Sequence, residues 1–572
     1  MFVKLTRSGP RRYLQLAESF RDESGRVKQR TLASLGRVEH VEPYLETLVR
    51  GLHRATGRPL PEPAATAADA PRFAPARSLG DVWALDALWR ELGLDRLAEV
   101  FRRGASRRKV PTEHVLRALV FNRLCDPESK LGVLRWLERV CLPGVQTSAI
   151  GHQHLLRAMD ALVEHRDKVD ALVAELLRPL IDVELSVVFY DLTTIRAEGL
   201  SEQDGDVRRY GQSKDGGIRR QFVLGLVQTA DGIPIHHEVF DGNVAETKTL
   251  RATLERVMAR FPIRRVIAIA DRGLMSADNL DELEGLTTPS GEPLEFILAV
   301  PGRRYGEFVE LLEPVHRRHF AAAEVETTAE LAWKGRRLVV AHDPARAAEG
   351  RTRRREMIQA LERQAAEWIG KLNDQDDGKR TRGRPLSDGG ARARFYHQVL
   401  EAKLGRIIRV DLKSELFSYR IDPKARGLAE LMDGKLLLVS NVAEETMDAG
   451  EIVQRYKALA DIERGFRVLK SEIEIGPVHH RLPERIRAHA MVCFVALIIH
   501  RVMRRRLRDG AGGAEVASSP ERALEQLRRI QRHEIRLGRR VHRGVTTIGA
   551  GEVALLKVLG AKKPSEAGLA GA

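Results

Sequence analysis

The sequence predicts an α/β protein whose core is a mixed β-sheet, with helical regions before and after it. Apolar stretches at 186–190, 221–227 and 233–240 are separated by polar, glycine-containing turns, which predicts a meander of three strands. Two further apolar stretches, 266–270 and 296–300, alternate with helical segments. A meander followed by helix–strand alternation is typical of a sheet with both parallel and antiparallel strands.

Three regions precede this core. Residues 12–36 alternate apolar and polar side chains around a polar turn, which predicts a β-hairpin. Residues 57–76 are rich in Pro and Ala without a helical or strand period, so we expect a linker. Residues 79–180 repeat apolar side chains at helical spacing and predict helices. A basic cluster at 102–109 is either a solvated turn or a phosphate contact.

Residues 305–440 interrupt the core. A charged amphipathic helix is expected over 357–372, followed by a polar loop over 373–390 that contains several Lys and Arg residues. The strands predicted around them are 338–341, 406–412, 416–421 and 436–439. We therefore expect a β-rich insertion that carries a helical arm.

Two helices are expected after the insertion. The first begins after Asp448, which can cap it with Glu451 in the capping-box position, and it ends at Gly476-Pro477. The second, about 484–508, is apolar on almost every side and should be buried. The C-terminal region should be helical and basic, because residues 501–543 contain 13 Arg, no Lys and 5 acids.

The composition limits the classes of function that the protein can have. A net charge of +16 and a pI of about 9.9 indicate a polyanionic partner such as nucleic acid, or simply an arginine-rich composition. Three widely spaced cysteines argue against a disulfide framework and a cysteine-rich zinc site, and fit a reducing cytoplasm. The N-terminus lacks the apolar core of a signal peptide, and the apolar stretch 490–499 is shorter than a membrane span needs.

Three acids are candidates for a metal site. Asp191 and Asp271 each follow an apolar strand, and Glu463 lies on the helix that begins after Asp448. Acids at the carboxyl ends of central strands are common site residues in α/β folds, and three of them can hold two Mg²⁺ ions for phosphodiester chemistry. The alternative for each aspartate is a helix cap or an ion pair.

The helix around Glu463 gives further context. Tyr456, Glu463 and Lys470 are spaced by seven and share one stripe, so a hydroxyl and an ammonium flank the carboxylate. These groups could hold a phosphate next to a metal ligand. Phe466 shares the stripe, so part of it belongs to the core, and a solvent-exposed ion-pair face remains the alternative.

Other patterns are weaker. The segment 211–217 lacks the full phosphate-loop spacing of an NTPase, although its Lys214 could contact DNA. Adjacent histidines at 236–237 and 479–480 are poor joint metal ligands where they lie in a strand, because neighbours there point to opposite faces. The pair at 152 and 154 has suitable spacing, but most such pairs are polar surface.

The helix 456–470 resembles the Tyr-x2-Arg-x3-Glu-x6-Lys signature of bacterial insertion-sequence transposases, which are DDE enzymes. Tyr190-Asp191-Leu-Thr-Thr and Ala270-Asp271-Arg272-Gly are similar to the first and second acid motifs of that family, and the similarity covers roughly 10–500. Leu459 occupies the position at which the signature has Arg. The phosphate contact that this Arg would make is therefore either absent or supplied by a neighbouring residue.

The resemblance implies an RNase H-like core split by the β-rich insertion, with Asp191, Asp271 and Glu463 as catalytic ligands of two Mg²⁺ or Mn²⁺ ions. It implies cleavage at the inverted-repeat ends of an element, 3′-OH attack on double-stranded target DNA, and a homodimer in the synaptic complex. The protein would act in the cytoplasm, at the nucleoid, without a membrane. The residues that we expect to contact DNA are Tyr456, Lys470, Arg467, Lys214 and Arg272.

Two other functions remain open at this point: a metal-dependent nuclease that cuts without joining, and a transposase-derived DNA-binding protein without catalysis. The expected regions are a hairpin region (1–56), a linker (57–78), a helical DNA-binding region (79–182), the first part of the core (183–304), the β-rich insertion (305–440), the second part of the core (441–510) and a basic helical C-terminal region (511–572).

Overall fold

The computed structural model of the chain divides into two compact units. One comprises Met1–Ala74 and Glu534–Arg543, and the other comprises Pro75–His533 and Gly544–Ala572. Most of the expected linker and of the basic cluster at 102–109 lies outside the described residues. The structure describes residues 1–57, 71–102, 110–180, 185–199, 203, 205–214, 216–245, 249–261, 265–270, 277–379, 384–458, 464–510 and 519–565.

The first unit contains an antiparallel sheet in the order β1–β2–β3. The hairpin predicted over 12–36 is confirmed, and a strand before it joins the sheet. At the hairpin turn, hydrogen bonds from Ser24 and Lys28 lower the pKa of Asp22 to about 2. The elements are β1 (Phe2–Ser8), β2 (Arg11–Arg21), β3 (Val27–Arg37), α1 (Val38–Val41), η1 (Glu42–Tyr44), α2 (Leu45–Ala55) and β4 (Arg72–Phe73).

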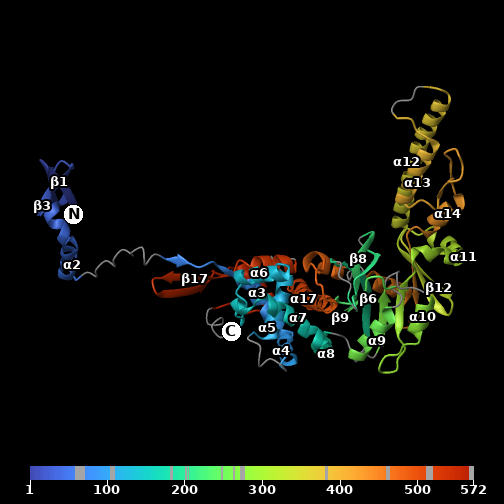
Figure 1. The fold of residues 1–572 in the computed structure, drawn as a ribbon, viewed down its shortest axis with the longest axis horizontal. Coiled ribbons are helices and arrows are strands. Elements are labelled where there is room, and N and C mark those ends of the chain that lie inside the picture. The colour runs from blue at the N-terminus through green and yellow to red at the C-terminus, as the bar shows by residue number, and fades with distance from the viewer. Residues whose placement is uncertain are drawn as a thin grey trace. The chain divides into compact units, whose positions relative to one another are not determined.

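The second unit begins with the helical region that the apolar spacing predicts (Figure 1). Its elements are β5 (Arg77–Ser78), α3 (Gly80–Glu91), η2 (Leu94–Arg96), α4 (Leu97–Val100), α5 (Thr112–Cys125), α6 (Lys130–Arg139), η4 (Thr147–Ala149), α7 (His152–Glu164), α8 (Arg166–Leu177) and η5 (Arg178–Leu180). The helix α17 (Pro483–Asp509) packs against α5 and α7. It is long and apolar enough to cross a membrane, but 94% of its most apolar window is buried inside the protein, which confirms a core helix.

A nine-stranded sheet forms the core, in the order β12–β13–β16–β11–β10–β6–β8–β7, with β9 also paired to β8. The pairs β6–β10 and β10–β11 are parallel and the others are antiparallel, so the predicted mixed sheet is confirmed. Its first elements are β6 (Leu185–Arg196), β7 (Arg209–Gln212), β8 (Ile218–Thr229), β9 (Pro234–Asp241), α9 (Leu250–Arg260), β10 (Arg265–Ala270), α10 (Ala277–Glu284) and β11 (Glu295–Ala299).

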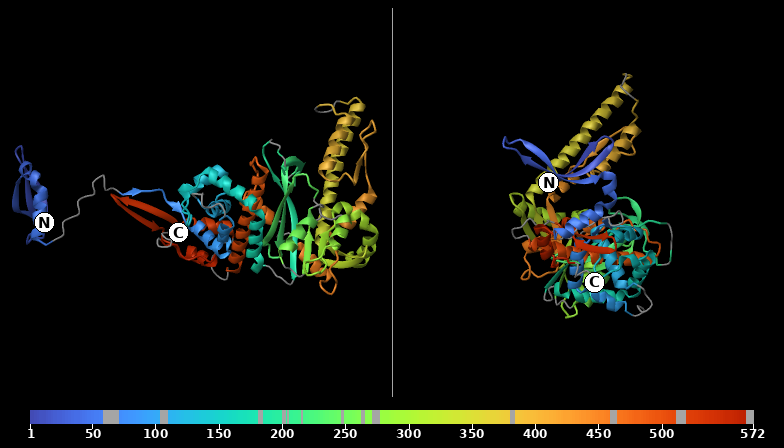
Figure 2. Two further views of the ribbon diagram at one scale, coloured as in Figure 1. Left: turned by 60° about the horizontal axis from the view of Figure 1, so that its bottom comes forward. Right: turned by 90° about the vertical axis from the view of Figure 1, so that its left-hand side faces the viewer.

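The expected β-rich insertion differs in two ways. Helical residues outnumber strand residues in it, and β12, β13 and β16 extend the core sheet instead of forming a separate body. The helical arm is confirmed, since α12 and α13 lie side by side and project from the sheet (Figures 1 and 2). The elements are η8 (Gly302–Phe308), α11 (Val309–Val315), η9 (His316–Phe320), β12 (Thr327–Trp333), β13 (Arg336–His342), α12 (Pro344–Asp376), α13 (Asp388–Glu401), β14 (Ile408–Val410), β15 (Tyr419–Ile421), α14 (Pro423–Met432) and β16 (Lys435–Ser440).

The end of the chain is not purely helical. After α15 (Ala449–Lys457), η10 (Val468–Glu472) and α17 come α18 (Pro520–Leu527), β17 (Gln531–Leu537), β18 (Arg540–Val545) and α19 (Ala550–Val558). The helical expectation is therefore wrong for 531–545. Gly538, between the two strands, has a φ of 57°, a left-handed conformation that glycine adopts readily and that permits a tight turn.

Candidate active site

Asp191 lies on β6, beside the carboxyl end of a parallel neighbour. The strand β10 pairs with β6 up to Ala270, which lies opposite Tyr190. On the other side of β6, the pairing with β8 continues to Arg196. The sequence predicts a strand that ends at Asp191, whereas β6 extends beyond it, because the next residues are mostly β-branched and pair with β8.

The surroundings of Asp191 come from its own strand and from the loop after β7. Asp191 is 8% exposed, and one carboxylate oxygen accepts a hydrogen bond from the backbone N–H of Leu192 at 2.7 Å. The ammonium of Lys214 is 3.6 Å from that oxygen and donates to the carbonyl of Leu192. The backbone N–H of Lys214 donates to the hydroxyl of Thr194 at 3.0 Å. The structure therefore brings a residue predicted as a DNA contact to the first acid.

Helix α15 covers the face of the sheet that carries Asp191. Phe189 shares this face, because alternate residues of a strand point the same way. It packs in an apolar cluster with Ile267 and Ile269 of β10 and with residues of α15, and Tyr456 of α15 is partly buried against this cluster. The expected helix cap is also present, since Asp448 precedes α15 and its side chain accepts from the N–H of Glu451 at 2.8 Å.

Helix α17 and residues 464–467 cover the same face further along β8. His237 of β9 is in register with Leu226 and so with Asp191, and its ring stacks on Phe494 of α17 with centroids 4.5 Å apart. A Cβ atom at Gly465 would lie 2.7 Å from the side-chain nitrogen of Gln228, which pairs with Phe189. Only glycine lets the helical backbone approach the strand so closely.

Four residues of the predicted site lie outside the described residues: Asp271, Glu463, Arg272 and Leu459. In the sequence, Asp271 directly follows the last residue of β10, and Glu463 directly precedes the helical residues 464–467. Of the three acids, the structure describes Asp191.

The predicted long helix is helical over 464–472, but it changes its form there and ends earlier than expected. Residues 468–472 form the π-helix η10, which ends at Glu472 and not at Gly476. Lys470 lies in this π-helix, whose turn is wider than that of an α-helix. The segment between Tyr456 and Lys470 includes residues 459–463, which lie outside the described residues. Arg467 is exposed and Lys470 is half-buried.

The sequence did not predict one group of metal-ligating side chains. Glu472 of η10, His500 of α17 and Glu521 of α18 bring their ligand atoms within 4.8 Å of one another. The His500 Nε2 atom is 2.6 Å from Glu521 and 3.0 Å from Glu472. Although burial opposes the charge on His500, its hydrogen bonds to the two glutamates raise its pKa. Because the three residues come from three elements, no local pattern signals the group.

The other histidines have structural surroundings. Burial lowers the pKa of His237 and of His480 to about 3. His154 accepts a hydrogen bond from the N–H of Gly151 at the start of α7. Across the described ranges, none of them belongs to a group of three metal-ligating side chains.

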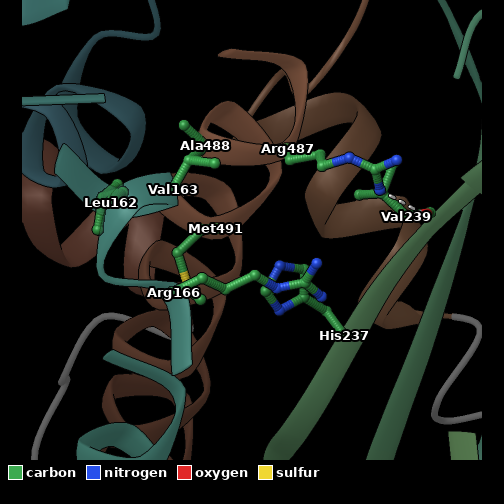
Figure 3. A pocket seen from close by; sticks show the side chains of 8 residues that line it. All are labelled: Leu162, Val163, Arg166, His237, Val239, Arg487, Ala488 and Met491. Atoms are coloured by element: carbon green, nitrogen blue, oxygen red, sulfur yellow. Dashed lines mark hydrogen bonds between the residues drawn. The ribbon is translucent and has the colours of Figure 1, made fainter. Parts of the chain in front are cut away.

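A small cavity lies between α7, α8, β9 and α17 (Figure 3). Arg166 and Arg487 line it together with His237. Arg166 donates to Glu238 at 3.0 Å, and Arg487 donates to the carbonyl of Val239 at 3.0 Å. Both arginines make these structural bonds, and Asp191, the one of the three predicted acids that the structure describes, does not line the cavity.

Comparisons with known proteins show the family to which the chain belongs. The N-terminal residues 3–67 match the IS1634 family transposase N-terminal domain, and residues 183–499 match the transposase DDE domain, which covers more than half of the chain. The protein belongs to the DDE transposases. The matched DDE domain has an RNase H-like fold and implies the use of divalent metal ions. No curated protein matches the transposase.

Among solved structures, the transposase is similar to a piggyBac transposase synaptic complex with hairpin DNA, determined by cryo-EM. The identity is 11%, the match covers 78% of this chain and 79% of that chain, and the TM-score is 0.36.

Proposed function

We propose that this transposase cuts DNA at the ends of its element and joins the 3′-OH to target DNA, with Asp191, Asp271 and Glu463 as the ligands of two Mg²⁺ or Mn²⁺ ions. The observation that carries the proposal is the register of β6 and β10. Tyr190 and Ala270 lie opposite each other, and each is followed in the sequence by an aspartate. Carboxyl ends of neighbouring parallel strands are common places for site residues.

The carboxylate chemistry fits such ions, because Mg²⁺ and Mn²⁺ prefer hard oxygen ligands and Asp191 offers its oxygens on a nearly buried strand. Two bound ions would activate the attacking hydroxyl or water and stabilise the leaving oxygen of an in-line displacement. The chain itself orients the Asp191 carboxylate through the N–H of Leu192. Lys214 keeps a positive charge beside that carboxylate and is close enough to reach a phosphate bound there.

The same proposal assigns the DNA contacts. Double-stranded element ends and target DNA would contact Tyr456, Arg467, Lys470, Lys214 and Arg272. Tyr456 and Lys470 flank Glu463 in the sequence, and the exposed Arg467 follows it on the described helix. Two ends must be joined in one event, so the active form would be a homodimer in a synaptic complex. The enzyme would act at the nucleoid in the cytoplasm.

A strand-transfer assay tests the proposal. A pre-cut oligonucleotide of the element end with a free 3′-OH is incubated with supercoiled plasmid and Mg²⁺. We expect joined products from the wild type and none from Asp191→Asn, Asp271→Asn or Glu463→Gln. Cleavage without joining identifies a nuclease. DNA binding with neither reaction identifies a non-catalytic binding protein, and normal joining by the three variants refutes the site assignment.

A further inference from the structure

Three elements meet at the side chains of Glu472, His500 and Glu521, which we call the ion cluster. The first glutamate lies on η10, the histidine on α17 and the second glutamate in the first turn of α18. Because α17 packs against both η10 and α18, the packing of three helical segments holds the cluster together. An ion bound there would link segments that are distant in the sequence.

The spacing of the ligand atoms suits one metal ion. The His500 Nε2 atom is 2.6 Å from the Glu521 carboxylate and 3.0 Å from the Glu472 carboxylate, and the three ligand atoms all lie within 4.8 Å of one another. Nitrogen and oxygen ligands lie about 2.0–2.2 Å from Zn²⁺, so two ligands of one ion are about 3 to 3.5 Å apart. The side chains therefore need to separate by less than about 1 Å to admit an ion.

The charges of the ion cluster do not balance without a divalent cation. Two carboxylates face one imidazole, which carries a single positive charge at most. Within the described part of the chain, neither glutamate forms an ion pair with a residue other than His500. The Nε2 atom has one hydrogen at most, so it can serve both carboxylates only by sharing that hydrogen. A divalent ion would offset both carboxylates and leave the imidazole neutral.

The ion cluster is open on one side. The side chains of Glu472 and Glu521 are 32% and 42% exposed, whereas that of His500 is 4% exposed. An ion can therefore enter from the solvent and complete its coordination with water, while packing fixes the imidazole. One imidazole with two carboxylates favours Zn²⁺ over Mg²⁺, because imidazole is a common ligand of Zn²⁺ and Mg²⁺ prefers oxygen ligands.

We propose that the ion cluster binds one Zn²⁺ ion, which links η10, α17 and α18. The site shares no residue with the three acids of the proposed function, and it adds a structural ion to the enzyme. His500 would bind the ion through a neutral Nε2 atom, so the hydrogen that the carboxylates now share would leave to the solvent as a proton. The bound ion would fix α18 to the rest of its unit and so stabilise the C-terminal region.

Zinc content measured without DNA tests the proposal. Asp191→Asn lacks a ligand of the proposed active site and so isolates the ion cluster. This full-length variant is stripped with EDTA, loaded with Zn²⁺, freed of excess metal by gel filtration and analysed by mass spectrometry. It should retain about one Zn²⁺ per chain, and X-ray absorption should show an imidazole nitrogen among the ligands at about 2.0–2.2 Å.

Adding Glu472→Gln or Glu521→Gln to this variant should weaken Zn²⁺ binding by more than about a hundredfold, since even the loss of an outer partner costs about 10–100-fold. Both glutamates are partly exposed, so the fold should persist, and circular dichroism checks it. The matched control is His397→Gln on α13, which removes an exposed imidazole 3.6 Å from Glu401 and should leave the zinc content unchanged.

Two results overturn the proposal. One is the absence of retained zinc in Asp191→Asn when the wild type retains it, because the ion then occupies the proposed active site. The other is equal zinc affinity with and without Glu472→Gln and Glu521→Gln. Since the measurement needs neither DNA nor strand transfer, failure of the proposed function leaves the result for the ion cluster untouched.

Discussion

Two carboxylate–cation pairs near β6 differ in how firmly they are held. Asp206 and Arg208 are almost inaccessible, with side chains 0% and 1% exposed. The Arg208 guanidinium donates to both carboxylate oxygens, at 2.6 to 3.0 Å, and to the backbone carbonyls of His480 and Arg481. Asp191 faces the Lys214 ammonium at 3.6 Å, and that lysine is 39% exposed.

The difference separates a structural pair from the pair at the proposed active site. A two-point guanidinium contact with further carbonyl acceptors fixes one geometry and stabilises the segment before α17. A flexible ammonium at 3.6 Å, open to solvent, can move away when a metal ion or a phosphate arrives. Substitutions at the first pair should therefore affect folding, and substitutions at the second should affect chemistry.

The largest effect is expected from Asp191→Asn. The amide keeps the shape but loses the charge that a metal ligand needs, so strand transfer should fall by more than about a hundredfold, because loss of an outer partner alone costs about 10–100-fold. The unfolding midpoint in urea should stay close to wild type. If activity persists while the fold is intact, Asp191 is not a metal ligand.

Asp206→Asn should act in the opposite way. It leaves the Arg208 guanidinium buried without its carboxylate, which costs about 3–5 kcal/mol of stability. We expect a lower urea midpoint, and normal strand transfer under conditions where the variant is folded. A midpoint equal to that of the wild type would show that the Asp206–Arg208 pair does not stabilise the fold.

A smaller effect is expected from Lys214→Gln. Removing the ammonium beside Asp191 removes a competitor for the carboxylate, so Mn²⁺ should bind a few-fold to about tenfold more tightly in an EPR titration without DNA. The control is Lys457→Gln on α15. This substitution breaks the ion pair of Lys457 with Glu326 and removes the same charge. Equal Mn²⁺ affinity in both variants and the wild type would exclude competition by Lys214.

The core elements could be predicted from the sequence because their patterns are local. Apolar runs located β6, β8, β9, β10 and β11, and the all-round apolar pattern located α17. The prediction failed where a tight turn or pairing with a strand distant in the sequence determines the local structure. The strands at 531–545 depend on a tight turn at Gly538, and β12, β13 and β16 join a sheet whose other strands lie far away in the sequence.

The candidate site was predictable in part. Asp191 could be found from its strand and from the family resemblance, but the position of Lys214 depends on how the loop after β7 folds onto β6. The π-helix at 468–472 also could not be predicted, since its residues suit an α-helix equally well. The proposed roles of Asp271 and Glu463 still rest on sequence position.

The smallest effect concerns the ion cluster of Glu472, His500 and Glu521, whose cation is a buried histidine with a raised pKa. Because the pKa of His500 is raised in the folded state, its ion pairs contribute fully to stability at a pH below 6.5, the pKa of the unfolded chain. This contribution is lost as the pH rises through the pKa of the folded state. The lowered pKa of Glu521 means that its contribution is present above the unfolded value of 4.5 and is lost in acid. In EDTA, the melting temperature of the wild type should therefore fall more between pH 6 and pH 9 than that of His500→Gln. Parallel curves for the two proteins would show that His500 is not charged in the folded state.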